Sequence, residues 1–175
     1  DQQSFISALQ YAAADFSPLL NESVSYMVGN NLYDFSVSAS KMDGSFTTYI
    51  SDYKAPFIFS WWTGGSTDIT TVLHELGHFT NYYLNPAVGY SAADNLDLAE
   101  IDSQALVLLM IDYYGDFYGK LSKDAMKDVL IDAMYSLISG CMEDEFQQIV
   151  YSTPGMTLKG PGQTQGEGHG QGGGF

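Results

Sequence analysis

Two histidines and a glutamate lie close together in a segment with a helical pattern. His74 and His78 are four residues apart, and Glu75 follows His74 directly. On a helix such a pair projects from one face about one turn apart, so both imidazoles could reach one Zn²⁺ at about 2.0–2.1 Å. Glu75 is rotated off that row and can lean toward an open coordination position, where zinc lowers the pKa of a water. The pattern predicts metal-assisted amide hydrolysis, in which Glu75 takes the proton of the water and passes it to the leaving amine.

A third metal ligand is needed, because a catalytic zinc usually has three protein ligands and keeps one position open. His169 is the only other histidine, but it lies in a glycine-rich stretch. The better candidates are downstream carboxylates: Asp94, Asp97, Glu100 and Asp102. Glu100 is the only glutamate between positions 75 and 143, and it falls early in the next predicted helix. The residues alone favour Glu100, with Asp97 as the next candidate; the alternative for Asp97 is that it is only a first-turn helix charge.

Hydrophobic periodicity predicts the helices that must position these side chains. The strongest pattern covers 68–84 and contains the histidine pair. Further helices are predicted over 96–114 and 122–151. Two helices are expected before them, the second over 18–30, with Ser17 as its N-cap and a proline at its first position.

Two short β-rich runs complete the predicted elements. They cover 46–50 and 57–62 and predict a hairpin or neighbouring edge strands. The expected fold class is therefore mainly α with a small β-sheet (α+β). The apolar run 105–111 predicts a helix that is buried all round. The helix over 122–151 is expected to have an inner face made of Met126, Leu130, Ala133, Met134, Leu137, Ile138 and Cys141. Cys141 is expected to be a small buried residue.

Composition excludes several classes of partner. The 175 residues contain 21 acidic and six basic residues, all lysine, and the formal net charge is −15. Nucleic acid and anionic membrane surfaces are disfavoured, because the field repels phosphate and no arginine is present. The longest nearly apolar run, 105–111, is too short to cross a bilayer. A negative field suits metal cations instead.

Four segments, taken in order, resemble a known family. Residues 41–46, 56–59, 65–69 and 74–78 are similar to the oligoendopeptidase F/thimet oligopeptidase family of zinc metallopeptidases, and the resemblance covers roughly 23–152. It implies a zincin-like catalytic core of the gluzincin type with one zinc ion, over 1–154, followed by a glycine-rich tail over 155–175. Residues 99–103 resemble the third-ligand segment of the family, in which a Glu precedes a Ser by three positions. The resemblance therefore selects Glu100 as the third ligand, beside His74 and His78, with Glu75 as general base.

The sequence departs from the family pattern in three places. Asn81 stands where a non-ligating histidine is common, and Val107 stands where a second glutamate is common. Asp102 is a candidate to replace that glutamate in orienting a histidine. The later family segment with tyrosine and histidine, which stabilises the oxyanion, has no match here. We therefore expect an incomplete catalytic core, with the remainder of a longer chain as a partner.

Substrate and function follow from the resemblance. Family members cut short peptides held along an edge strand beside the motif helix, and the matching strand would be 57–62. Phe57, Phe59 and Trp61 are then expected to contact a peptide substrate, although core packing is an alternative for the tryptophan. The leading hypothesis is a zinc endopeptidase or oligopeptidase. The alternatives are a truncated or non-catalytic module that binds zinc or peptide, and an acidic structural domain without metal.

The sequence gives two different expectations for the localisation of the protein. The family resemblance implies the cytoplasm, whereas the arginine-free composition, rich in Ser, Tyr and Gly, favours a secreted or cell-surface protein. The sequence begins at Asp1 without Met or a basic and apolar leader. Either a leader has been removed or the sequence is a segment of a longer protein.

Overall fold

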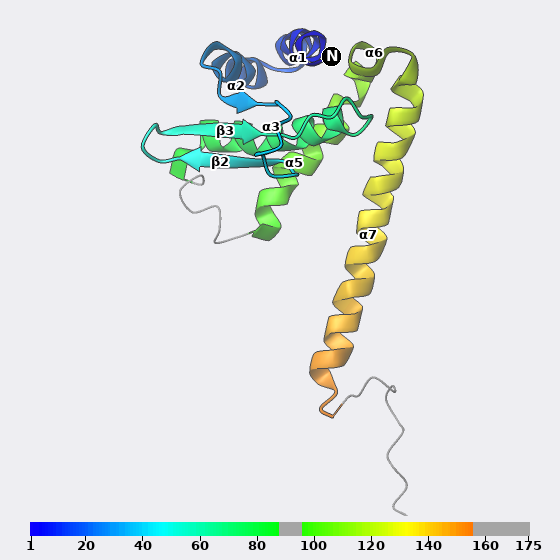
Figure 1. Ribbon diagram of the computed structural model, residues 1–175. Coiled ribbons are helices and arrows are strands. Elements are labelled where there is room, and N and C mark those ends of the chain that lie inside the picture. Colours follow the sequence, from blue (N-terminus) through cyan, green and yellow to red (C-terminus); the bar gives the residue numbers. More distant parts are fainter. Residues whose placement is uncertain (88–95, 156–175) are drawn as a thin grey trace, which may run out of the picture. The chain divides into compact units, whose positions relative to one another are not determined.

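The computed structural model describes residues 1–87 and 96–155. Contacts divide the chain into two compact units, the first over 1–131 and the second from Asp132 onward. The elements, drawn in Figure 1, are α1 (Gln2–Phe16), α2 (Pro18–Gly29), β1 (Tyr33–Asp34), β2 (Phe46–Ile50), β3 (Ala55–Phe59), α3 (Asp68–Leu84), α5 (Leu96–Leu109), α6 (Tyr114–Tyr118) and α7 (Ser122–Ser152), with short 3₁₀ turns at Met110–Tyr113 and Gly119–Leu121.

The predicted class, mainly α with a small sheet, is confirmed by this arrangement. Among the described residues, no helix combines the length and the hydrophobicity that a bilayer crossing requires. The predicted glycine-rich tail lies almost wholly outside the described residues, as does its histidine, His169.

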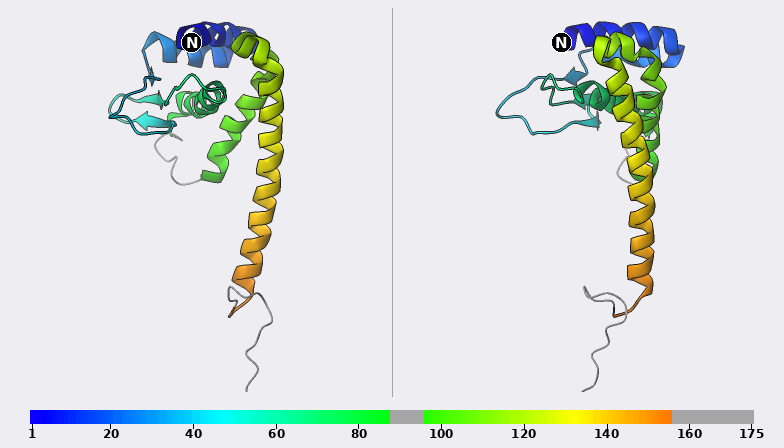
Figure 2. Two further views of the ribbon diagram at one scale, coloured as in Figure 1. Left: turned by 45° about the vertical axis from the view of Figure 1, so that its right-hand side comes forward. Right: turned by 90° about the vertical axis from the view of Figure 1, so that its right-hand side faces the viewer.

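The N-terminal helices begin at side-chain caps. Asp1 accepts a hydrogen bond from the backbone N–H of Ser4 at 2.9 Å and starts α1. Ser17 accepts from the N–H of Leu20 at 3.1 Å and starts α2 at Pro18, so the predicted N-cap is confirmed. Such caps satisfy N–H groups that have no partner inside the helix. Figure 2 shows the two helices lying side by side at one end of the first unit.

The sheet has the order β1-β3-β2, with β1 parallel and β2 antiparallel to β3. β3 is thus the central strand, and the expectation that 57–62 forms an edge strand is wrong. The strand also begins and ends earlier than predicted, at Ala55 and Phe59. The reason is β1, a strand of two residues that is too short to leave a periodic signal in the sequence. β2 is an edge strand of the sheet, within the described ranges.

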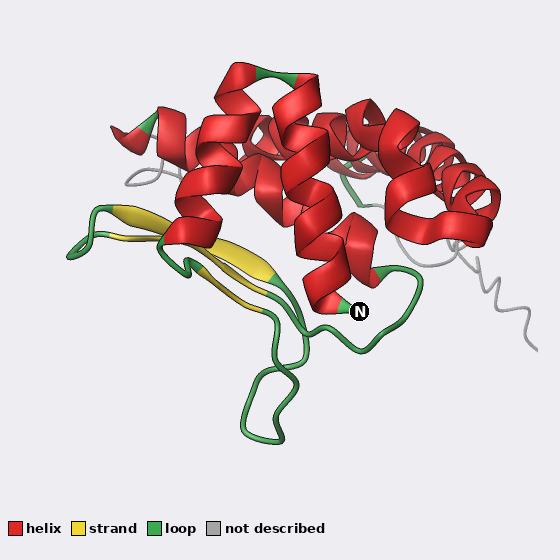
Figure 3. Cartoon of the chain, turned by 90° about the horizontal axis from the view of Figure 1, so that it is seen from above, coloured by secondary structure: helices red, strands yellow, loops and turns green. Residues whose placement is uncertain are grey.

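The two faces of the sheet differ. Thr47 pairs with Ile58, and this row faces the helices, where Ile58 is fully buried. Phe46 pairs with Phe59 on the opposite row, and their rings stack with centroids 4.8 Å apart. Figure 3 shows helices over one face of the sheet, and no described helix covers the other. Side chains alternate between the faces of a strand, so Phe57 also lies on the face away from the helices.

The core of the first unit lies where α1, α2, α3 and α5 meet above the sheet. α3 has the predicted bounds and buries its apolar stripe completely at Val72, Leu73, Leu76 and Phe79. Burial of such side chains stabilises the fold by about 1.5–3 kcal/mol each. The other large side chains that are at most 3% exposed are Phe5, Ile6, Leu9, Val24, Met27, Phe35, Ile58, Met110 and Tyr114.

The segment 105–111 is not buried all round, so that prediction is wrong. Leu106 and Val107 are buried, whereas Leu108 and Leu109 are 40% and 56% exposed. α5 packs on α3 along one face only, which leaves the other face of the helix in contact with solvent. The helix also ends earlier than predicted, at Leu109 rather than near 114. After Leu109 the backbone tightens into the 3₁₀ turn at Met110–Tyr113.

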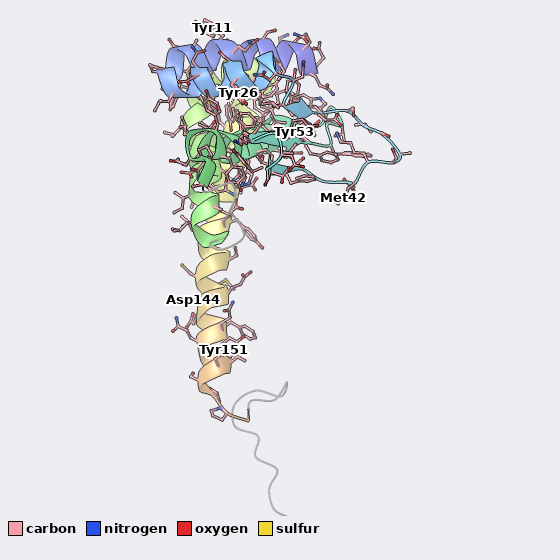
Figure 4. The ribbon with its side chains drawn as sticks, turned by 90° about the vertical axis from the view of Figure 1, so that its left-hand side faces the viewer. Tyr11, Tyr26, Met42, Tyr53, Asp144 and Tyr151 are labelled. Atoms are coloured by element: carbon pink, nitrogen blue, oxygen red, sulfur yellow. The ribbon has the colours of Figure 1, made fainter. Side chains whose placement is uncertain are left out.

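α7 is continuous over the predicted length and through Gly140, but the predicted inner face is wrong beyond Met126, which is partly buried against the core. In the first unit its buried residues are Ala125 and Val129. The described part of the second unit contains no other helix against which the rest of α7 could pack. The residues that are therefore exposed include Leu130, Met134, Leu137, Ile138 and Cys141. In Figure 4 the side chains of Asp144 and Tyr151 also extend from this part of the helix into open surroundings.

Lys41 holds together the loops that flank the sheet. Its side chain is only 6% exposed. Its Nζ donates to the carbonyl oxygens of Asp34, Ser36 and Ser60 at 2.8–3.0 Å. It also pairs with a carboxylate oxygen of Asp34 at 3.2 Å and lies 4.1 Å from the ring centroid of Phe59. Hydrogen bonds from Ser36 are the main reason that the pKa of Asp34 is lowered, and Lys41 adds to them.

We expect Lys41→Met to destabilise the first unit by about 2–3 kcal/mol, because three carbonyl oxygens lose a charged donor. The free energy of unfolding in urea measures the change. Lys127→Met, at an exposed position, is the control and should change this free energy by less than about 0.5 kcal/mol. Equal effects of the two substitutions would contradict the role of Lys41.

Candidate metal centre

The two histidines project from α3, whose start is fixed by a buried carboxylate. Asp68 is 7% exposed and accepts from the backbone N–H groups of Gly64 and Gly65 at 2.6 and 3.0 Å. His74 and His78 follow on the less buried side of the helix, one turn apart. Their rings meet edge to face with centroids 4.9 Å apart. The side chains are 24% and 12% exposed, so both remain accessible.

Glu100 reaches the histidine pair from the first turns of α5. Its Oε2 lies 3.2 Å from Nε2 of His74 and 3.7 Å from Nε2 of His78. One ligand atom from each of these three residues lies within 4.8 Å of the other two. Among the other predicted candidates, Asp94 and the side chain of Asp97 lie outside the described residues. The structure therefore brings together the three residues predicted as ligands.

The donor set fits a zinc ion. Two imidazole nitrogens and one carboxylate oxygen form one of the ligand sets of catalytic zinc, with one position left for water or substrate. The first unit contains no cysteine, so it offers no soft thiolate ligand of the kind that other metal sites require. His74, His78 and Glu100 could therefore hold the ion.

Glu75 points from α3 toward the edge strand. The hydroxyl of Thr47, on β2, lies 2.8 Å from Oε2 of Glu75 and 2.8 Å from its backbone oxygen. Glu75 is only 6% exposed, and this burial raises the pKa of its carboxyl above the usual 4.5, while the hydrogen bond from Thr47 opposes the shift. A carboxylate with a raised pKa is better suited to accept a proton.

Burial also acts on the first histidine. It lowers the pKa of His74 below the usual 6.5, although the nearby Glu100 carboxylate opposes this shift. A lowered pKa keeps the imidazole neutral at neutral pH. The neutral imidazole is the form that binds metal.

The predicted role of Asp102 in orienting a histidine finds no support in the described contacts. Its Oδ2 accepts instead from Nδ2 of Asn81 at 2.5 Å. This hydrogen bond joins α5 to α3 beside the ligands. Val107, at the second family position that differs here, is buried in the core.

Two of the three aromatic residues predicted to contact substrate lie away from the metal ligands. Phe57 and Phe59 lie on the face of the sheet opposite to α3. Trp61 follows the central strand, and its backbone N–H lies 3.4 Å from Oγ of Ser45. The neighbouring Trp62 packs on the rings of Phe5 and Phe35 in the core.

Three residues near the ligands were missed by sequence reasoning. Thr47 contacts Glu75, and Ser103 contacts Glu100 through a 3.0 Å hydrogen bond. Tyr82, one turn beyond His78, lies parallel to its ring with centroids 6.4 Å apart. The spacing of His78 and Tyr82 could have indicated this contact, whereas the contact of Thr47 depends on the fold.

No protein-family model and no curated protein matches the sequence. Solved structures do match. A protein assigned as oligoendopeptidase F is 34% identical, with a TM-score of 0.72 over 90% of this chain and 28% of its own. PZ peptidase A, solved with an inhibitor, is 31% identical, with a TM-score of 0.74 over 86% of this chain and 27% of its own.

A third structure agrees with these two. A protein from Bacillus anthracis str. Ames, also assigned as oligoendopeptidase F, is 28% identical, with a TM-score of 0.72 over 91% of this chain and 30% of its own. The chain thus spans less than a third of the length of each structure. Over the segment that it spans, the chain is similar in sequence and fold to structures of the oligoendopeptidase F family.

Proposed function

We propose that this chain is the zinc-binding catalytic segment of a peptidase that hydrolyses peptide bonds. The observation that carries the proposal is the convergence of His74, His78 and Glu100, with Glu75 beside them. The similarity to structures of peptidases supports the same class of reaction. Because the chain spans 27–30% of those structures, the activity of the whole protein is part of the proposal.

Each residue has a defined task in this proposal. His74, His78 and Glu100 hold the metal ion. When bound, zinc supplies Lewis acidity, which makes an attacking water acidic enough to react near neutral pH. Glu75 takes the proton of that water and later donates it to the leaving amine. Thr47 holds the Glu75 carboxylate in place through its hydroxyl.

The peptide is proposed to lie along β2. This strand pairs with β3 on one side only, within the described residues, and Thr47 in its second position contacts Glu75. An extended peptide can add to such an edge through backbone hydrogen bonds. Substrate would then lie next to the general base, whereas β3 has neighbours on both sides.

Metal removal tests the proposal. We expect one zinc per chain by elemental analysis of protein purified without chelators. We also expect cleavage of a fluorogenic peptide that a zinc chelator abolishes and added zinc restores. His74→Ala should lose both zinc and cleavage. Substoichiometric zinc in the folded wild-type chain, or cleavage that is insensitive to chelator, would contradict the proposal.

A second candidate is a zinc-binding module without turnover. It is proposed for this segment taken alone, which spans 27–30% of the length of the similar structures. It predicts one zinc per chain, loss of zinc in His74→Ala, and no cleavage of any peptide by the wild-type chain. The same assays therefore separate the two candidates.

A further inference from the structure

α5 crosses α3 at very close range, and Gly77 makes this possible. A Cβ atom at Gly77 would lie 2.5 Å from Cα and 2.9 Å from the backbone nitrogen of Ser103. It would also lie 2.8 Å from the carbonyl oxygen of Asp102. All three are backbone atoms, so no rotation of a side chain could make room. The backbone of α5 at 102–103 therefore rests directly on the backbone of α3 at Gly77, the residue before His78.

Ser103, at this crossing, is joined to the third proposed ligand. It is fully buried, and its hydroxyl lies 3.0 Å from Oε2 of Glu100 and 3.1 Å from the backbone oxygen of Glu100. Oε2 is also the atom that lies 3.2 and 3.7 Å from the two imidazoles. The hydrogen bond therefore acts on the oxygen that faces the candidate metal position.

We propose that Gly77 and Ser103 are positioning residues that set the place of the Glu100 carboxylate at the metal. Gly77 fixes the distance between the two helices, and Ser103 fixes the rotamer of the Glu100 side chain. This inference rests on the proposed function, because it requires Glu100 to bind zinc. The Glu100 side chain is 54% exposed, so solvent would otherwise leave it free to adopt other rotamers, and fixing it lowers the entropy that metal binding costs.

A purely structural reading of Ser103 also exists. Serine in a helix often donates to the carbonyl oxygen three or four residues earlier, and the 3.1 Å contact with the Glu100 backbone is of this kind. That reading predicts a small change in stability and no change in zinc affinity. Zinc affinity thus separates the two readings.

Ser103→Ala is the first test. We expect its zinc affinity, measured by competition with a chromophoric chelator, to fall by about 10–100-fold, as for other partners that orient a ligand. Circular dichroism of the metal-free protein should match that of the wild-type chain. In a Glu100→Ala background, Ser103→Ala should cause no further loss of affinity, because its partner is absent. Equal zinc affinity of Ser103→Ala and wild type would overturn the inference.

Gly77→Ala is the second test, with Gly115→Ala as its control. An added Cβ at Gly115 would meet no atom within 4 Å. We expect Gly77→Ala to weaken zinc binding more than Ser103→Ala does, and Gly115→Ala to leave it unchanged. Since Gly77→Ala could prevent folding, the Ser103 variant decides the inference alone if that happens.

The proposed function and the role of Ser103 would fail in different ways. If the folded wild-type chain binds no zinc, the proposed function fails and the inference fails with it. If the wild-type chain binds one zinc that depends on His74, but Ser103→Ala binds zinc equally well, only the inference fails.

Discussion

Glu75→Gln is expected to lower the rate of peptide hydrolysis by about 10²–10⁴-fold, the usual contribution of a general base, without loss of zinc. The amide cannot take a proton from the attacking water. It keeps the shape of the side chain, and its oxygen can still accept the hydrogen bond from Thr47 that the carboxylate accepts at 2.8 Å. The loss should therefore appear in kcat, while the zinc content stays at that of the wild-type chain.

The measurements are peptide cleavage and elemental analysis on the same preparation. Glu143→Gln, at an exposed position in α7, is the matched control and should leave both values unchanged. Hydrolysis at the wild-type rate in Glu75→Gln would remove Glu75 from the mechanism. Loss of zinc in this variant would assign it a role in metal binding instead.

The same variant should be more stable than the wild-type chain when both are metal-free at neutral pH. Burial raises the pKa of Glu75 in the folded state above 4.5. The unfolded chain therefore releases this proton at lower pH than the folded chain does, and stability is lost as pH rises through the folded pKa. The neutral amide avoids this loss. The difference in melting temperature should grow as pH rises from 4.5.

Glu100→Gln is expected to weaken zinc binding by about 100-fold or more, which exceeds the loss expected for a residue that only orients a ligand. The substitution removes the negative charge and the carboxylate oxygen that lies closest to both imidazoles. Zinc prefers deprotonated carboxylate ligands. The stability of the metal-free chain should change little, because the Glu100 side chain is more than half exposed.

Chelator competition measures this affinity, again with Glu143→Gln as the control. Asp102→Asn adds a closer comparison, since Asp102 lies on the same helix but contacts Asn81. We expect its zinc affinity to stay near that of the wild-type chain. Unchanged affinity in Glu100→Gln would show that another group supplies the third ligand.

The helix that contains the two histidines, α3, could be predicted from sequence because the same helical spacing determines both its buried stripe and the position of its proposed ligands. The apolar stripe of 68–84 and the spacing of His74 and His78 are local, and local patterns survive any tertiary arrangement. Glu100 was harder, because its approach depends on how α5 crosses α3. The residues alone favoured Glu100 with Asp97 next, and the family resemblance then selected Glu100.

Other features could not be predicted, for physical reasons that differ. β1 has two residues and owes its existence to pairing with β3, so the central position of β3 has no local signal. The contact of Thr47 with Glu75 joins residues 28 positions apart. For α7 the periodicity correctly predicted a helix, but burial requires a neighbour, and a pattern cannot tell whether one is present.

The exposed apolar side chains of α7 have a practical consequence for all these measurements. Nine large side chains between positions 130 and 149 are each at least 44% exposed: Leu130, Ile131, Met134, Tyr135, Leu137, Ile138, Met142, Phe146 and Ile149. An exposed hydrophobic surface of this kind promotes self-association of the protein and binding of hydrophobic dyes. Zinc titrations should therefore be carried out at low protein concentration and repeated at several concentrations, so that self-association is not mistaken for a change in zinc affinity.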